Sequence, residues 1–134
     1  SMIIQRPIPV QIKLSLLNPE YDFLMKSVCG NMGISDEELS TDVRRLIARV
    51  TDWHAGLPRE SRGHFHFYLH NTIPSASAII IDENETYGTL QLETGAYRAP
   101  TIESFGFELR HGSELFATLQ RAYNRLIADA NRIL

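Results

Sequence analysis

The chain has 134 residues, 43% of them hydrophobic and 22% charged, which predicts one folded domain over residues 1–134 with a single core. The formal net charge of -3 argues against a protein that holds nucleic acid through bulk positive charge. The lone cysteine, Cys29, excludes an internal disulfide, and no apolar run reaches the roughly 18 residues that a membrane-spanning helix needs. We therefore expect a cytoplasmic protein.

The beginning of the chain lacks the cationic start of a signal peptide. Ser1 before Met2 is typical of a residue left by cloning. The chain is therefore either an intact protein or a domain of a longer one, in which a membrane or effector domain could lie elsewhere.

The first predicted elements are a strand and a helix. Apolar and polar residues alternate over residues 9–17, the pattern of a strand covered on one face. Asn18 and Pro19 follow as a helix cap and a first helical residue. This helix is expected to stop near Gly30 or Gly33, since glycine commonly ends helices.

A second helix and four strands are expected next. Ser35 and Glu38 form a capping box, which predicts a helix over about 36–55. Further strands are expected over residues 64–70, 75–82, 86–92 and 104–110, and an amphipathic helix follows from Ser113. The fold class is therefore α/β, a mixed β-sheet with flanking helices in the order β-α-α-β-β-β-β-α.

Three histidines share one face of the strand at 64–70. His64 and His66 have the His-x-His spacing that can place two imidazoles on one metal ion. His70 lies roughly 13 Å beyond His66 at the rise of a strand, and the sequence marks no third ligand. The alternative is an outward face of partly exposed histidines with no metal, and we expect neither a metal nor a cofactor.

Two short segments are candidate anion sites. Arg110 and His111 stand just before the last helix, where free backbone amides and a cationic side chain can hold an anion. The alternative is that Ser113 merely caps this helix, with Glu114 satisfying its dipole. In the loop over 93–101, Tyr97 and Arg98 offer a stacking ring beside a guanidinium, a pairing suited to a nucleotide.

The segment from Ser75 to Asp82, followed by a turn and a second apolar run, resembles a half-site of the phospholipase D family. That family carries His-x-Lys-x4-Asp, then a Gly and an Asn after a short turn. Asp82 matches the acidic position, while Ser75 and Ser77 stand where the reactive His and Lys would be. Gly88 and Gln91 fall one residue early for the Gly and Asn positions.

This resemblance covers roughly residues 9–133 and implies a degenerate, non-catalytic half-domain, because serine cannot replace an imidazole nucleophile without a nearby base. Similar modules occur in bacterial regulatory and antiviral defence proteins as sensors. The implied function is binding of a nucleotide or oligonucleotide signal, with Ser75 and Ser77 on the ligand face. Family members join two half-sites, so homodimerisation is implied as well.

Two other functions remain open from the sequence. The first is an enzyme, a metal- or histidine-dependent phosphodiesterase or other hydrolase that uses the face of His64, His66 and His70. The second is an oligomerisation module without a ligand. Asp82 also has an ordinary explanation, since Asp often starts a turn through hydrogen bonds to nearby backbone.

Overall fold

The computed structural model shows an α/β fold with one six-stranded sheet, and it describes residues 10–73, 77–94 and 105–134. The elements in chain order are β1 (Ile12–Leu17), α1 (Asp22–Met32), α2 (Asp36–Ala55), α3 (Arg59–Arg62), β2 (Phe65–His70), β3 (Ser77–Ile81), β4 (Thr89–Thr94), β5 (Phe105–Arg110), α4 (Glu114–Ala128) and β6 (Asn131–Arg132). The predicted α/β class and mixed sheet are confirmed. The predicted order lacked α3 and β6, because elements of four and two residues are too short to show a period.

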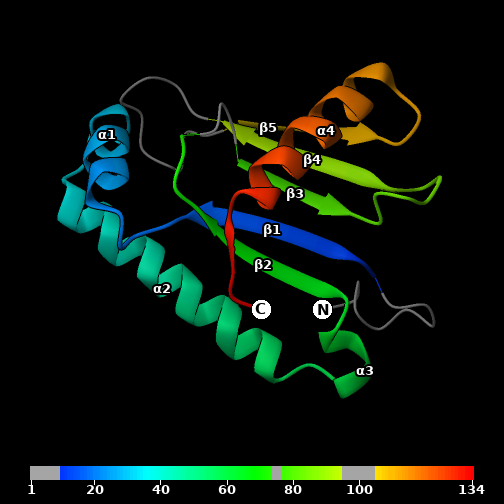
Figure 1. The fold of residues 1–134 in the computed structure, drawn as a ribbon, viewed down its shortest axis with the longest axis horizontal. Coiled ribbons are helices and arrows are strands. Elements are labelled where there is room, and N and C mark those ends of the chain that lie inside the picture. The colour runs from blue at the N-terminus through cyan, green and yellow to red at the C-terminus, as the bar shows by residue number, and fades with distance from the viewer. Residues whose placement is uncertain (1–9, 74–76, 95–104) are drawn as a thin grey trace.

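The sheet combines one parallel pair with antiparallel neighbours. Its strands lie in the order β5-β4-β3-β1-β2-β6 (Figure 1). β1 and β2 are parallel, so a tight turn cannot join them, and α1, α2 and α3 make the connection. β3 returns antiparallel on the other side of β1, and β4 and β5 extend the sheet from there.

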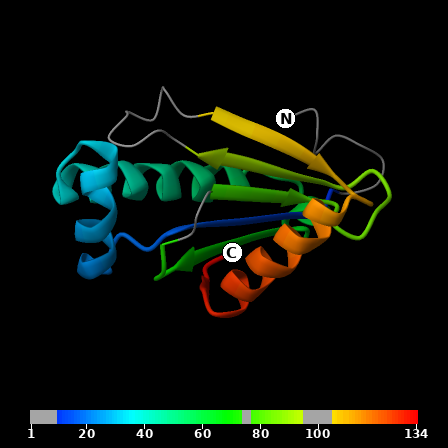
Figure 2. The same cartoon turned by 90° about the horizontal axis from the view of Figure 1, so that it is seen from above.

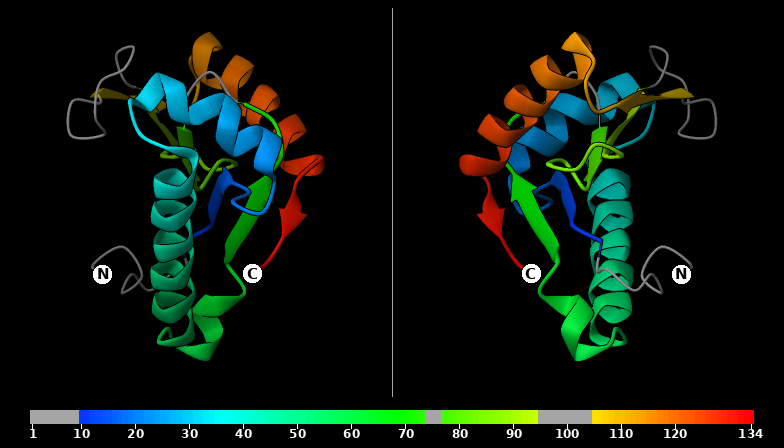
Figure 3. Two further views of the ribbon diagram at one scale, coloured as in Figure 1. Left: turned by 90° about the vertical axis from the view of Figure 1, so that its left-hand side faces the viewer. Right: turned by 90° about the vertical axis from the view of Figure 1, so that its right-hand side faces the viewer.

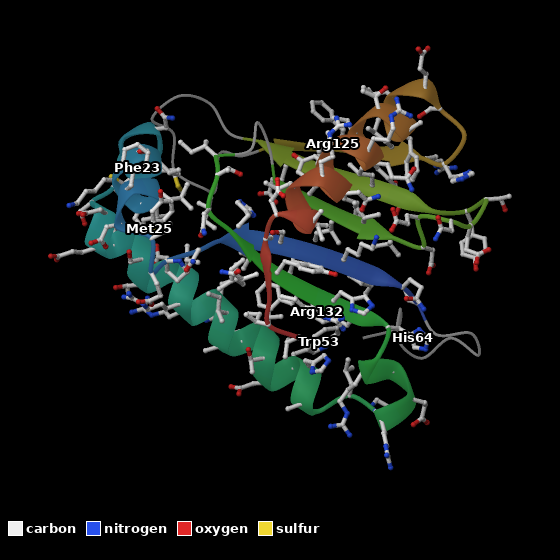
Figure 4. All side chains as sticks on the ribbon, viewed as in Figure 1. Phe23, Met25, Trp53, His64, Arg125 and Arg132 are labelled. Carbon is white, nitrogen blue, oxygen red and sulfur yellow. The ribbon has the colours of Figure 1, made fainter. Side chains whose placement is uncertain are left out.

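Two helices cover opposite faces of the sheet, as Figure 3 shows for α2 and α4. On the α2 face, Phe65 and Phe67 are buried, and Trp53, which Figure 4 labels, packs edge-on against Phe65 with 5.0 Å between ring centroids. On the α4 face, Leu90 is buried beneath Phe116. Within the residues that the structure describes, no helix has the length and apolar character needed to cross a membrane.

α1 lies across one end of the sheet (Figure 2), and it begins at Asp22, so the prediction of Asn18 as its cap was wrong. The Asn18 side chain instead accepts a hydrogen bond from the Glu20 N–H at 3.1 Å, and the Asn18 N–H donates to the His70 carbonyl at 2.9 Å. The bond to His70 joins the end of β1 to the end of β2, and the bond from Glu20 shapes the turn before the helix. The helix stops at Gly33, as predicted, where φ is 69°.

The last helix is followed by a strand that the sequence did not predict. α4 ends at Ala128, and β6 then pairs antiparallel with β2, placing Arg132 opposite Tyr68. The N–H of Ile133 continues this contact by donating to the Phe67 carbonyl at 2.9 Å. The pairing covers part of the β2 edge and brings a guanidinium to it.

Asp82 organises the turn after β3. Its carboxylate accepts from the N–H of Gln11 at 2.8 Å, and its own N–H donates to the Gln11 carbonyl at 2.8 Å. The carboxylate therefore holds the start of β1. The backbone of Asp82 adopts a φ of 48°, which is uncommon outside glycine. Gly88 closes the turn so tightly that a Cβ there would lie 2.1 Å from the Asp82 carbonyl oxygen.

We predict that Gly88→Ala lowers the free energy of unfolding by about 2–3 kcal/mol, because the added methyl group meets backbone that cannot rotate away. Gly30→Ala is the matched control, since a Cβ on Gly30 in α1 meets nothing within 4 Å. That control should stabilise the protein by about 0.5–1 kcal/mol. Urea unfolding of both variants measures the difference, and equal stabilities would contradict the close contact.

Candidate functional site

The described residues of the predicted ligand site lie apart. Ser77 begins β3 and pairs with Glu93, whereas Arg110 ends β5 and pairs with Thr89, which lies opposite Ile81 at the far end of β3. The two ends of β3 are roughly 13 Å apart at the rise of a strand. Ser77 and Arg110 therefore do not converge on one small ligand. Ser75, Tyr97 and Arg98 lie outside the described residues.

The corner between β5 and α4 has the structure of a capped helix. Ser113 is the N-cap, and its hydroxyl accepts from the Phe116 N–H at 3.0 Å. The His111 ring packs edge-on against Phe116, 5.5 Å between centroids, and both Arg110 and His111 are exposed. Capping by Ser113 is thus confirmed, and an anion at this corner would compete with the hydroxyl for the helix amides.

A different set of polar side chains does converge, on the face of the sheet that α4 covers only in part. Because side chains alternate along strands, the residues of β1, β2 and β6 that point away from α2 share this face. We call it the histidine face, and its members are Lys13, Ser15, His66, Tyr68, His70 and Arg132. Figure 4 shows Arg132 and His64 along β2.

The predicted alternation of the histidines is confirmed, but the expected exposure is wrong for His70, of which 4% is exposed. His66 and Tyr68 are half-buried. His64 precedes β2, and its Nδ1 accepts a hydrogen bond from the Gln11 side-chain amide. The burial follows from the parallel pairing, which places a second strand beside the histidines instead of solvent.

One end of the histidine face holds a charge cluster. The Lys13 ammonium donates to the Glu83 carboxylate and, at 3.3 Å, to Asn124 of α4. Glu83 also accepts from the amides of Gln120 and Asn124, each at 2.9 Å. Burial by itself would raise the pKa of Glu83, but the hydrogen bonds from Lys13, Asn124 and Gln120 outweigh it and lower that pKa. The cluster joins β1 and the β3–β4 turn to α4, and Glu83 balances the charge of Lys13.

His66 stands beside this cluster with an unused ring nitrogen. Lys13 is its register partner, and its Nδ1 is buried with no hydrogen-bond partner in the described part of the chain. Burial lowers the pKa of His66, and the positive charges of Arg132 and Lys13 and the neighbouring His64 lower it further. The imidazole of His66 thus lies near the guanidinium of Arg132 and near Lys13, whose charge Glu83 balances.

Ser15 and His70 form a buried pair at the other end of the face. The Ser15 Oγ lies 2.7 Å from His70 Nδ1, while His70 Nε2 has no partner among the described residues. Burial lowers the pKa of His70 to about 4. Such a weak base cannot activate a hydroxyl at neutral pH, and 8% exposure of Ser15 leaves a substrate little access. The pair is therefore better explained as structure than as a catalytic dyad.

The histidines do not gather around one point. His66 and His70 are four residues apart on β2, roughly 13 Å at strand rise. No group of three His, Cys, Asp or Glu side chains within residues 10–73, 77–94 and 105–134 could hold a metal ion. The metal-site alternative for this face consequently lacks a third ligand in the described residues.

Sequence reasoning missed most of this site, although weak signals were present. The alternation over 9–17 already placed Lys13 and Ser15 together, and Gln120 and Asn124 have the i, i+4 spacing of one helix face. Glu83 and Arg132 carried no such signal. Their roles depend on a turn and a strand pairing that residues distant in sequence create.

Comparison with known proteins returned no similarity. No family model matches the chain, and no curated protein or solved structure matches it significantly. The chemistry of its own residues is therefore the basis for assigning a function.

We predict that the protein loses stability as the pH falls from 6.5 to 4. In this window the unfolded chain protonates His70, whose ordinary pKa is 6.5, while the folded protein holds it neutral down to about 4. The unfolded state then binds more protons, so stability is complete above pH 6.5 and decreases by about 3 kcal/mol toward pH 4.

Urea unfolding across this pH range measures the effect. His70→Leu should flatten the pH dependence by about this amount, since no proton is then taken up at position 70 on unfolding. Ser15→Ala is the control, because His70 stays buried and the dependence should persist. An unchanged slope in His70→Leu would assign the effect to another group.

Proposed function

We propose that this domain binds an anionic, nucleotide-like ligand without converting it, and that the histidine face holds the ligand. The observation that supports this most is the position of His66, whose buried Nδ1 lacks a described partner while the positive charge of Arg132 lies close enough to lower the pKa of the ring. A buried polar atom without a partner costs about 1–3 kcal/mol, and because the His66 ring as a whole is only half-buried, a turn of the ring toward a ligand would recover that energy.

A phosphate group suits the pair formed by His66 and Arg132. Arg132 is exposed, and its Nε donates to the Leu134 carbonyl at 2.9 Å, which fixes the direction of the guanidinium. The two amino groups of that guanidinium can donate to a phosphate as a fork. A protonated His66 would add a further donor to the same anion.

Tyr68 offers an aromatic ring on which a nucleobase can stack. It is half-buried, lies between His66 and His70 along β2, and has Arg132 opposite it on β6. An aromatic ring beside a guanidinium can stack a base while the cation holds its phosphate, and base–aromatic stacking contributes about 1–3 kcal/mol. The combination favours a nucleotide over inorganic phosphate.

The absence of turnover is part of the proposal. Ser75 and Ser77 stand where the phospholipase D family carries its reactive His and Lys, and burial lowers the pKa of both His66 and His70, which makes each a weak base. Binding without reaction is the behaviour of a sensor or regulatory domain. A role in bacterial signalling or defence is what the resemblance adds to this proposal.

We predict that Arg132→Ala and His66→Gln each weaken nucleotide binding by about one to two orders of magnitude, the loss of one charge-assisted hydrogen bond. Isothermal titration with a panel of mono- and dinucleotides measures it, with product analysis by chromatography to detect turnover. Arg49→Ala is the matched control, since it removes an exposed arginine from α2 on the other side of the sheet.

The pH dependence separates the two variants. A bound anion favours protonated His66, so affinity should rise as the pH falls below 6.5 in the wild type and in Arg132→Ala. His66→Gln should lose this dependence. Wild-type affinity in both variants would reject the histidine face, and selective loss in Arg110→Ala would favour the corner before α4 instead.

A further inference from the structure

β5 is the outermost described strand on one side of the sheet. Its six residues pair with β4 on one side, and no described element lies on the other (Figure 2). The opposite margin ends in β6, which has two residues and so offers little edge. An open edge strand presents unpaired N–H and C=O groups that another strand can bind. β5 contains neither proline nor lysine, the residues that often block such pairing.

The hydrogen-bonding pattern shows which groups of β5 point outward. The His111 N–H donates to the Gly88 carbonyl at 2.9 Å, at the position that continues the β4–β5 pairing. Backbone groups alternate sides along a strand, so Gly106, Glu108 and Arg110 direct their N–H and C=O away from β4. A new antiparallel strand would therefore form its hydrogen bonds with these three residues.

We propose that β5 pairs antiparallel with β5 of a second copy of this chain, about a two-fold axis at Leu109. In this register Glu108 lies opposite Arg110 of the second copy, and symmetry repeats the ion pair. Leu109 lies opposite its own equivalent. One surface that complements itself is what a closed two-fold dimer requires.

Charge complementarity selects this register from the alternatives. For at least two of the three outward-pointing residues to face outward-pointing residues of the second copy, the axis must pass through residue 107, 108 or 109. An axis at Glu108 places two carboxylates opposite each other, and an axis at Phe107 places Glu108 opposite Gly106. Only the axis at Leu109 gives opposite charges on both sides, and directly opposed charges of unlike sign stabilise strand pairs.

The apolar side chains on the other face of β5 support a contact there. Phe107 is 53% exposed, although it shares the α4 face with the half-buried Leu109. Pairing about Leu109 brings Phe107 against His111 of the second copy. The dimer would thus bury aromatic surface that one copy leaves in water.

The experiment exchanges the charges. Analytical ultracentrifugation over a range of concentrations should show a dimer for the wild type. Glu108→Lys and Arg110→Glu should each raise the dimer dissociation constant by at least about tenfold, since each turns two attractive pairs into repulsive ones. The double variant E108K/R110E restores unlike charges and should restore the dimer.

Two controls make each outcome decisive. Glu37→Lys and Arg49→Glu, exposed residues of α2, make the same charge changes away from β5 and should leave the dimer intact. Circular dichroism checks that each variant is folded. A monomeric wild type, single variants that dimerise normally, or a double variant that fails to recover would overturn the proposal.

This interface is independent of the proposed ligand. The histidine face lies on β1, β2 and β6, separated from β5 by β3 and β4. Monomeric Glu108→Lys should therefore bind nucleotides as the wild type does. A wild type that binds nucleotides but stays monomeric rejects the dimer alone, and a wild type that dimerises but binds no nucleotide rejects the ligand proposal alone.

Discussion

The parallel pairing of β1 with β2 is the constraint on which the rest of this structure depends. Parallel strands need a long connection, and here α1, α2 and α3 supply it while α2 covers one face of the pair. The same pairing aligns Lys13 with His66 and Ser15 with Tyr68 on the other face. The polar side chains of β1 and of β2 would each be largely exposed to solvent on a single strand. Side by side, they form one partly buried surface.

Burial then determines the chemistry of that surface. Desolvation is the largest cause of the lowered pKa of both His66 and His70, so both imidazoles lose affinity for protons where the sheet shields them from water. The charge of Lys13 is compensated because Glu83, which accepts hydrogen bonds from Gln120 and Asn124, provides a countercharge. The Nδ1 of His66 has no hydrogen-bond partner among the described residues.

The two edges of the sheet differ in the strands that form them. β6 pairs with the outer side of β2 and supplies Arg132 to the histidine face, so closing that edge also completes the candidate site. β5 has no described neighbour on its outer side, and its charges alternate in a way that complements a second copy. The proposed ligand site and the proposed dimer interface therefore lie on separate parts of the sheet.

The sequence by itself determined the local structure. Alternation predicted β1 and β2, the capping box at Ser35 predicted the start of α2, and Gly33 and Ser113 marked helix ends, because these signals depend on neighbouring residues. The strand expected over 86–92 begins later, at Thr89, because residues up to Gly88 form the turn after β3. Where a longer-range bond competed, the local signal was misleading. Asn18 has the chemistry of a helix cap, but its N–H is held by the His70 carbonyl at the end of β2.

Only the tertiary structure decided the candidate site. Lys13 meets Glu83 across 70 residues of chain, and Arg132 reaches Tyr68 through a two-residue strand with no periodic signal. The burial of His70 likewise arises from the strands and helices around it, and no property of the segment 64–70 indicates it. Strand register and burial both depend on contacts between segments that are distant in sequence. The sequence therefore shows which residue types are present, but it does not show which of them come into contact.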